Sequence, residues 1–450
     1  MHEIQITSRR LFGVVLGLAA RFDVPWLAAR VLHSIIRPLN INRTIALTKN
    51  RNRVLILNSD KDEFLQDIAE SFLENTDTEL VYWPSYALGC IADEILAPSL
   101  GHNNYITTDP EIEKSKLRYR NFLEKVWKHH QAVYRIDAVI GANFGYRIQR
   151  EFATALESAG TPFIVVQKEN LNASSPTRRA VWHRIYKDKR GPFGGRKILV
   201  YNNIERDLQI SSGIIDAQNV VVTGMPRLDK LHRWRRENAG PAKNGGTPQV
   251  LFFTFSLHEK LPNPQQIESS VAGRDWGVFW EHTHHAILNL ARENADIQVV
   301  VKTKGNSRQD IAIHQIFQDG ELPANLKIVS GGDARNLIAE SHVVVGFNTT
   351  GLLEALAIGR PVVVPRFAEA CDNTMREFIL DLGDAVDYAN SPHQIVEKAC
   401  RYARTPPETP LELSEHVAST LKFWLGNDDG FSGRRVQESV RKEITLTAAP

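Results

Sequence analysis

Short, continuously apolar runs alternate with helical patterns along this sequence, and the alternation starts anew halfway along the chain. Strands that are apolar on both faces are typical of a parallel sheet covered by helices on both sides. The pattern predicts strands at 54–57, 79–83, 138–141, 163–166, 198–200 and 220–222 in the first half. It predicts strands at 250–255, 297–301, 326–329, 343–345 and 362–364 in the second half.

Two domains follow from the length and from one change in composition. A chain of 450 residues exceeds the size at which a single hydrophobic core stops growing. Residues 239–248 are rich in Gly, Pro and small polar side chains, as a linker is. We therefore expect an α/β fold of two Rossmann-like, doubly wound domains facing a cleft, at 51–238 and 249–427. A helical extension (1–50) precedes them and a tail (428–450) follows.

The composition excludes several classes of protein. The net charge of +2 argues against a dedicated nucleic-acid-binding protein. The three cysteines, Cys90, Cys371 and Cys400, are too far apart to indicate a disulfide framework or a metal site, and their small number fits a reducing cytoplasm. No apolar run reaches the roughly 18–20 residues that span a bilayer. The sequence predicts a cytoplasmic protein without a bound metal.

Residues 8–37 combine Arg with Leu, Val, Ile and Trp, and Pro25 divides them into two short helical stretches. One interpretation is a pair of helices packed on the first domain. The other is peripheral contact with the cytoplasmic face of the inner membrane, which Arg beside large apolar side chains favours. A signal peptide is a third possibility, but no small-residue cleavage site follows the apolar stretch.

The most informative stretch is 343–367, VVVGFNTTGLLEALAIGRPVVVPRF. A buried strand leads into a small polar turn at 346–351, and a helix begins at once and ends at Gly359. Backbone N–H groups, hydroxyls and the positive end of a helix then converge, which suits a phosphate. Glu354, one turn into the helix, can accept hydrogen bonds from two ribose hydroxyls. The alternative is an ordinary helix-capping turn with a surface Glu.

This stretch resembles the donor-binding motif of GT-B glycosyltransferases, especially bacterial enzymes of surface and capsular polysaccharide synthesis. The resemblance implies that Asn348, Thr349, Thr350 and Gly351 meet the donor phosphates and that Glu354 meets the ribose. It also implies metal-independent chemistry with no cofactor besides the nucleotide-sugar substrate. The segment TGMPRLD at 223–229 is similar to the end of the first domain in the same family.

Lysines follow another strand of the second domain, in VKTK at 301–304. In the family that the chain resembles, a cation at this place neutralises the donor pyrophosphate. Because that leaving group gains negative charge, a fixed cation stabilises the transition state. We expect Lys302 to act in catalysis and Lys304 to bind the donor, with a solvated loop lysine as the alternative.

The acceptor hydroxyl needs a general base, and acidic side chains at strand ends of the first domain are the candidates. Glu169 follows the strand at 163–166 and is the first choice. Asp60 follows the strand at 54–57 and is the second, and His102 lies in a polar loop. Helix capping or a surface charge is the other interpretation of each.

A basic stretch at 178–190 also carries Trp182 and Tyr186. It fits an anionic lipid-linked glycan acceptor or a membrane surface, or else a solvated helix face. Taken together, the sequence predicts a glycosyltransferase of the bacterial cell envelope that moves a sugar from a nucleotide donor to a polysaccharide or lipid-linked glycan. A nucleotide-sugar 2-epimerase of the same fold and a non-catalytic scaffold of a polysaccharide assembly complex remain alternatives.

Overall fold

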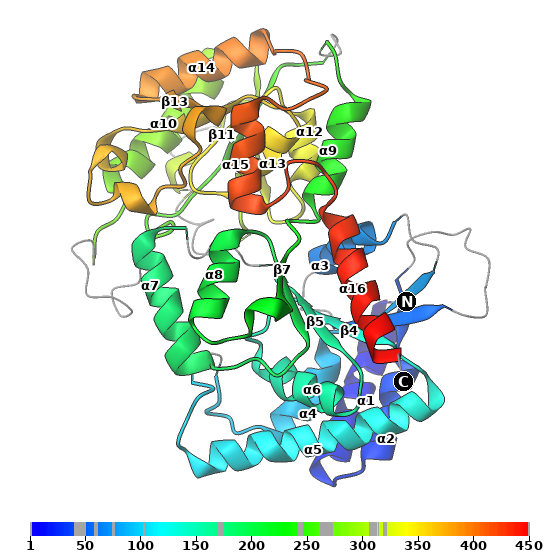
Figure 1. Ribbon diagram of the computed structural model, residues 1–450. Helices are drawn as coiled ribbons and strands as arrows, with labels where there is room; N and C mark the ends of the chain where they lie inside the picture. The colour runs from blue at the N-terminus through cyan, green and yellow to red at the C-terminus, as the bar shows by residue number, and fades with distance from the viewer. Residues whose placement is uncertain are drawn as a thin grey trace. The chain divides into compact units, whose positions relative to one another are not determined.

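The computed structural model describes residues 2–39, 51–57, 62–73, 77–101, 104–168, 171, 174–241, 246–261, 273–305, 313, 315–317 and 322–448. The chain forms two compact units (Figure 1). Unit 1 comprises Met1–Asn170, Trp182–Arg227 and Phe431–Pro450, and unit 2 comprises Leu171–Val181 and Leu228–Gly430. The change of unit at Arg227 lies 11 residues before the predicted domain end at 238.

Unit 1 is built on a sheet whose described strands follow the order β1-β3-β2-β4-β5-β6-β7. All neighbours are parallel except β1, which runs antiparallel to β3. The strands are β1 (Arg37–Pro38), β2 (Asn52–Leu57), β3 (Thr78–Trp83), β4 (Ala138–Gly141), β5 (Phe163–Val166), β6 (Lys197–Val200) and β7 (Val220–Val222). The central strands are buried, which explains their continuously apolar sequences.

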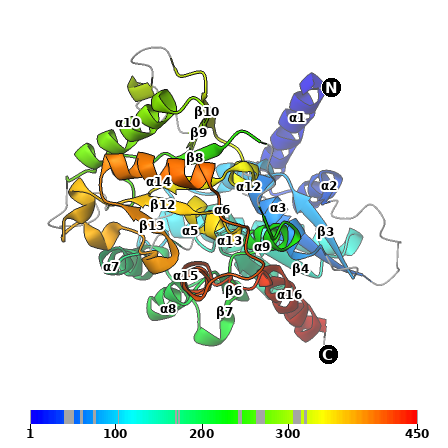
Figure 2. The same cartoon turned by 90° about the horizontal axis from the view of Figure 1, so that it is seen from above.

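Helices cover the unit 1 sheet and extend beyond it. They are α1 (His2–Arg21), α2 (Pro25–Ser34), α3 (Asp62–Ser71), α4 (Tyr86–Ile95), α5 (Pro110–Val133), α6 (Arg147–Ser158), α7 (Pro176–Ile185), α8 (Asn203–Ser211) and α16 (Ser432–Ala448). The predicted N-terminal helices are present: α1 packs on α4, α2 packs on α5, and α1 and α2 lie side by side (Figure 2). The packed interpretation of this segment therefore holds for one face of each helix.

The C-terminal helix α16 returns to unit 1, although the sequence suggested only a polar tail. Its side chains Val436, Val440 and Ile444 are buried in the core that β2, β4 and α3 form. These three residues recur every fourth position, so they line one face of the helix. Lys197 of β6 forms a buried ion pair with Glu443, which ties the same helix to the sheet.

Glu443→Gln is expected to lower the free energy of unfolding by roughly 2 kcal/mol. It leaves the nearly buried ammonium of Lys197 without its carboxylate, and breaking a fully buried pair costs roughly 3–5 kcal/mol. Chemical denaturation followed by fluorescence measures the change. Glu438→Gln on the same helix is the control, because its pair with Arg434 is exposed and is worth less than about 1 kcal/mol. Equal losses in the two variants would contradict a structural role for the buried pair.

Unit 2 repeats the architecture with a parallel sheet whose described strands follow the order β10-β9-β8-β11-β12-β13. The strands are β8 (Gln249–Phe253), β9 (Gln298–Thr303), β10 (Leu326–Ser330), β11 (Val343–Gly346), β12 (Val362–Pro365) and β13 (Asp387–Ala389). The helices are α9 (Leu228–Glu237), α10 (Gly277–Glu293), α12 (Arg335–Glu340), α13 (Thr350–Ala357), α14 (Pro392–Arg404) and α15 (Glu415–Leu425). The predicted fold of two Rossmann-like, doubly wound halves is confirmed.

Candidate functional site

In the parallel sheet of unit 2, the order in which successive strands are added reverses between β8 and β11. From β8, the strands β9 and β10 extend to one side, whereas β11, β12 and β13 extend to the other. In open parallel sheets, ligands bind beyond the carboxyl ends of the strands at such a switch point. Thr254 follows β8 there, and the polar turn at 348–351 follows β11.

The turn after β11 forms the start of α13, as the sequence predicts. Thr349 is the N-cap residue, and its hydroxyl oxygen accepts a hydrogen bond of 3.3 Å from the N–H of Gly351. Thr350 is the first residue of the helix. The first N–H groups of an α-helix have no intrahelical acceptor and carry the positive end of its dipole. This terminus therefore has the local geometry that anions prefer.

The side chain of Asn348 makes structural hydrogen bonds, whereas its place in the turn suggested a contact with phosphate. Its backbone has a φ of +51°, in the left-handed region that Asn tolerates. Its buried side chain donates to the carbonyl of Phe378 (2.9 Å) and accepts from the N–H of Leu380 (2.6 Å). The amide thus holds the segment after β12 against the turn, and any phosphate contact of Asn348 falls to its backbone.

Gly351 is required by close packing. A Cβ at this position would lie 2.7 Å from two ring atoms of Phe253, at the end of β8. The missing side chain lets the helix terminus approach the neighbouring strand at the switch point.

Gly351→Ala is expected to lower the free energy of unfolding by about 2 kcal/mol, because the ring of Phe253 must move within a packed core. Thermal unfolding measures this loss. Gly89→Ala in α4 is the matched control: its Cβ meets nothing within 4 Å, so its stability should stay equal or rise by up to about 1 kcal/mol. An unchanged Gly351→Ala variant would show that Phe253 does not confine the turn.

Glu354 lies one turn into α13 and is only 5% exposed. The alternative interpretation is thus half right: Thr349 does cap the helix, but Glu354 is not a surface residue, because its side chain is inside unit 2. Burial of a carboxylate is costly unless hydrogen-bond donors satisfy it. Glu354 is therefore a buried carboxylate one turn from the helix terminus, and its contact with a ribose remains a prediction.

The two predicted lysines occupy different environments. Lys302 is the penultimate residue of β9 and is buried, and its ammonium donates to the carbonyl of Thr303 (2.8 Å). Lys304 follows the strand, and 47% of its side chain is exposed. Its ammonium contacts both carboxylate oxygens of Glu259 at 2.9 Å. Of the two, Lys304 is the one whose charge reaches the surface at the carboxyl end of the sheet.

Lys304 lies near Glu259 and Lys260, which the sequence did not single out, and near Arg178 of the predicted basic stretch. Glu259 is buried, and the indole N–H of Trp276 donates to its carbonyl at 2.9 Å. Lys260 is the next residue, and burial lowers its pKa from the ordinary lysine value. Arg178 donates to the carbonyl of Lys260 at 3.0 Å. We call Arg178, Lys260 and Lys304 with their shared neighbour Glu259 the cation group.

Glycines bring the loops after β9 and β10 together beside the cation group. A Cβ on Gly305 would lie 3.0 Å from the Cα of Gly331, and both residues have a positive φ. Only glycine meets both demands without strain. At this point of approach, Gly305 and Gly331 therefore present backbone rather than side chains.

The predicted general bases Glu169 and Asp60, and the alternative His102, lie outside the described residues. Their roles remain predictions. What the structure does describe is the switch point of unit 1, between β2 and β4. The loop after β4 is compact, with the Asn143 side chain accepting from the N–H of Gly145 at 2.8 Å.

Aromatic side chains and Arg190 adjoin this loop. The Arg190 guanidinium lies 5.3 Å from the ring centroids of both Trp182 and Tyr186. A Cβ on Gly145 would lie 2.6 Å from the same guanidinium. The end of the predicted basic stretch therefore packs against the loop at the unit 1 switch point. The pattern Gly-Ala-Asn-Phe-Gly after an apolar strand was the available signal in the sequence.

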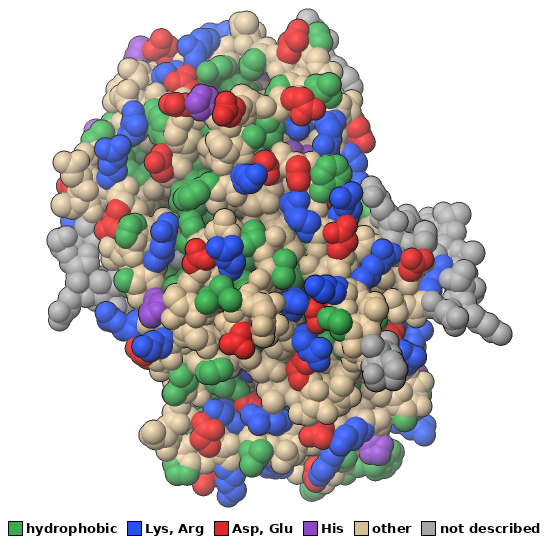
Figure 3. Space-filling view, in the orientation of Figure 1, with side chains coloured by type: hydrophobic (Ala, Val, Ile, Leu, Met, Phe, Trp, Pro, Cys, Tyr) green, Lys and Arg blue, Asp and Glu red, His purple; other side chains and the backbone are tan. Residues whose placement is uncertain are grey.

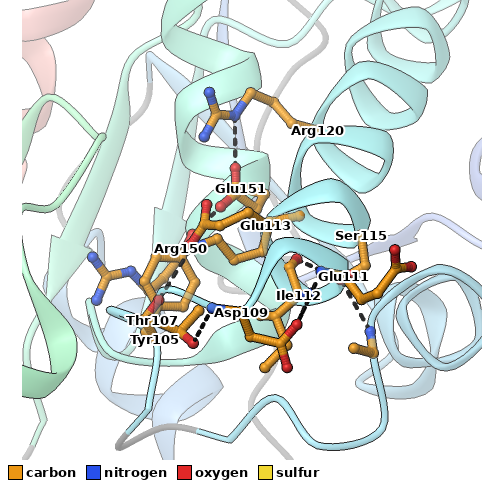
Figure 4. A network of polar contacts seen from close by, with 12 residues as sticks. Tyr105, Thr107, Asp109, Glu111, Ile112, Glu113, Ser115, Arg120, Arg150 and Glu151 are labelled. Carbon is orange, nitrogen blue, oxygen red and sulfur yellow. Dashed lines mark hydrogen bonds and ion pairs between the residues drawn. The ribbon is translucent and has the colours of Figure 1, made fainter.

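A buried polar network holds α6, which follows that loop (Figure 4). The Tyr105 hydroxyl donates to Glu151, and the Nε of Arg120 contacts the other oxygen of the same carboxylate at 2.6 Å. The guanidinium of Arg150 lies 3.9 Å from the centroid of the Tyr105 ring. Burial, followed by the charge of Glu151, raises the pKa of Tyr105 well above its usual range. The network thus joins α5, α6 and the segment before α5 that contains Tyr105.

The described residues contain no candidate metal site, and the face shown in Figure 3 carries charges of both signs. Among the described residues, no three His, Cys, Asp or Glu side chains gather closely enough to hold a metal ion. No helix in that part of the chain is long and apolar enough to cross a bilayer. Lys, Arg, Asp and Glu are interspersed on the face that Figure 3 shows.

Comparison with known proteins gives structural neighbours only. Neither a scan of protein families nor a search of curated proteins finds a match. The UDP-GlcNAc 2-epimerase from Neisseria meningitidis bound to UDP-GlcNAc is 13% identical, with a TM-score of 0.47 over 87% of this chain and 100% of the other. A glycosyltransferase from Rickettsia africae is 11% identical, with a TM-score of 0.46 over 88% and 99%. The wall teichoic acid polymerase TagF is 10% identical, with a TM-score of 0.49 over 99% of both chains.

At such low identity the likeness concerns the fold of the chain, and the activities in those names belong to those proteins. The organisation that this chain itself displays is two doubly wound units, with a hydroxyl-rich helix terminus, a buried Glu354 and the cation group at strand ends of the second.

Proposed function

We propose that the protein is a glycosyltransferase that moves a sugar from a nucleotide-activated donor to a surface polysaccharide or lipid-linked glycan. The observation that carries the proposal is the set of groups at the carboxyl edge of the unit 2 sheet. The terminus of α13 suits an anion, Glu354 is a fixed buried acceptor, and Lys304 supplies a cation.

The proposed chemistry needs four contributions. Glu354 accepts hydrogen bonds from the ribose and so orients the nucleotide. The backbone N–H groups at Thr350 and Gly351 meet the donor phosphates. As the acceptor oxygen bonds to the anomeric carbon, the bond from that carbon to the diphosphate breaks, and the diphosphate takes the electron pair. Lys304 stabilises the charge that develops there. A base, for which Glu169 and Asp60 remain the candidates, takes the proton of the acceptor.

The names of the structural neighbours support a nucleotide sugar as ligand, since one was solved with UDP-GlcNAc. They do not separate transfer from 2-epimerisation. The hydroxyl-rich turn with a single Glu354 favours transfer, because the epimerases that the sequence resembles usually carry paired acids there.

A thermal-shift panel with UDP, GDP, CDP, CMP, dTDP and ADP, with and without magnesium, tests the proposal. A ligand that binds only the folded state raises its stability, by about 2.7 kcal/mol at 100 times its Kd. We expect one nucleotide to stabilise the protein equally in both conditions. Incubation with the matching nucleotide sugar then separates the reactions, since an epimerase changes the sugar without an acceptor. No stabilisation by any of the six would contradict a donor site and favour the scaffold alternative.

A further inference from the structure

One face of α1 is packed and the opposite face is apolar and exposed. Gly13 and Gly17 face α4, where Cβ atoms would contact Cys90 and Glu94. On the other side lie large apolar side chains that are each 45–69% exposed: Leu11, Val14, Leu18 and Phe22. Their spacing keeps all four within about a quarter of the helix circumference. We call them the apolar stripe.

The charges beside the apolar stripe that lack an ion-pair partner in the described structure are positive. From Arg10 onward, the exposed charged residues of α1 are Arg10 and Arg21, and α2 adds Arg30. Within the described residues, Arg10 and Arg30 form no ion pair, whereas Arg21 pairs with Glu94. Asp23, between the helices, is paired with Lys125. Arginines around an exposed apolar face are the mark of a helix that lies in a membrane interface.

A pocket of about 340 Å³ lies between α5 and α2, the helix that packs against α1. Its lining comprises Trp26, Ala29, Arg30, His33, His129, His130, Ala132 and Val133. Trp26 and Val133 are also exposed to solvent by more than half of their surface. The side chain of His130 is 1% exposed, and neither ring nitrogen has a hydrogen-bond partner in the described structure. Buried polar atoms without partners in a pocket point to a polar ligand.

We propose that α1 and α2 dock on a bilayer that contains anionic phospholipids, with the apolar stripe in the headgroup boundary and a lipid phosphate in the pocket beside Trp26. The uncompensated arginines complement an anionic surface. A second copy of the chain fits less well, because joining two such faces brings their arginines together. An exposed Trp at the edge of the pocket suits the boundary between water and lipid. The proposal stands independently of the transferase activity.

Co-sedimentation of the full chain with vesicles tests the proposal. The vesicles are pure phosphatidylcholine or phosphatidylcholine with phosphatidylglycerol, in about 0.1 M salt. Wild-type protein should bind the anionic vesicles more tightly, and binding should weaken as salt rises. Leu18→Glu with Phe22→Glu should reduce the partition coefficient at least about tenfold. Leu411→Glu with Leu446→Glu is the control pair, because these residues are 58% and 57% exposed elsewhere and should leave binding unchanged.

Single arginine variants separate the contribution of the pocket to vesicle binding from the contribution of surface charge. Arg10→Gln should weaken binding to anionic vesicles about fivefold through surface charge alone. Arg30→Gln should weaken it more, because it also removes a pocket contact with the phosphate. Equal losses would overturn the pocket, and equal binding to neutral and anionic vesicles would overturn the role of the arginines. If wild-type protein binds no vesicles, or dimerises through the stripe instead in light scattering, membrane docking is wrong.

Discussion

Replacing Glu354 by Gln is expected to weaken nucleotide binding by about 100-fold and to change the melting temperature little. In the proposed complex, its carboxylate accepts hydrogen bonds from both ribose hydroxyls. Such charge-assisted bonds are worth roughly 1.5–3 kcal/mol each, and a Gln side chain cannot accept both with full charge. Losing about 3 kcal/mol corresponds to roughly 100-fold in Kd. Gln has the same shape, so packing around the buried position is preserved.

Titration calorimetry with the nucleotide that stabilises the wild-type protein measures the effect. Glu397→Gln is the control, since it removes the same charge from an exposed position on α14 of the same unit. Its affinity should match that of the wild type. If Glu354→Gln also binds normally, the ribose role is wrong even though the protein binds a nucleotide. If Glu354→Gln unfolds, its carboxylate serves the fold, and the melting temperature reveals this directly.

The fold could be predicted from the sequence wherever burial leaves a local signature. β4, β5 and β7 match the predicted strands to the residue. These strands are short and apolar because a parallel sheet covered on both faces must be so. β1 and β13 were missed because neither carries an apolar run, whereas the edge strand β7 reads Val-Val-Val. With a neighbour on one side only, β13 can read Asp-Tyr-Ala and carry no apolar run.

Long-range packing could not be predicted. The apolar positions of α16 were visible as a weak helical pattern, but their partner is a sheet more than 200 residues earlier in the chain. No local sequence feature distinguishes a helix that packs on a distant sheet from a polar tail that does not. The cation group poses the same problem. Arg178 and Lys260 are 82 positions apart, and only the fold brings the guanidinium to the Lys260 carbonyl.

The site was predictable where one continuous segment forms it. The N-cap of Thr349, the start of α13 at Thr350 and the helix end before Gly359 follow from adjacent residues. The side-chain amide of Asn348 was less predictable, because its partners are the backbone groups of residues 378 and 380. The sequence assigned catalysis to Lys302 and donor binding to Lys304, but two identical residue types in one stretch offered no physical reason for that order. The burial of the two side chains distinguishes them, because burial decides which ammonium can approach a ligand.

Replacing Lys304 by Ala is expected to lower kcat for sugar transfer by about 100- to 1,000-fold, the usual cost of removing one fixed group that stabilises transition-state charge. Glu259 holds the Lys304 ammonium through two contacts of 2.9 Å, so the cation is positioned before the donor arrives. Pre-positioned charge stabilises the leaving diphosphate more than the bound donor, because the leaving group gains charge as the bond breaks. The Kd for the nucleotide should therefore rise less than kcat falls.

Steady-state transfer kinetics and nucleotide titration on the same protein separate the two effects. Lys327→Ala on β10 is the control, because that lysine is exposed in the same sheet and should keep full activity. Lys304→Arg retains the charge and should recover part of kcat. A higher KM with unchanged kcat would mean that Lys304 binds donor and transition state equally, which contradicts the proposed role. Lys302→Ala tests whether Lys302 is the catalytic cation instead. A loss of folding stability would identify Lys302 as a packed strand residue. A stable variant with low kcat would assign the catalytic cation to Lys302 rather than Lys304.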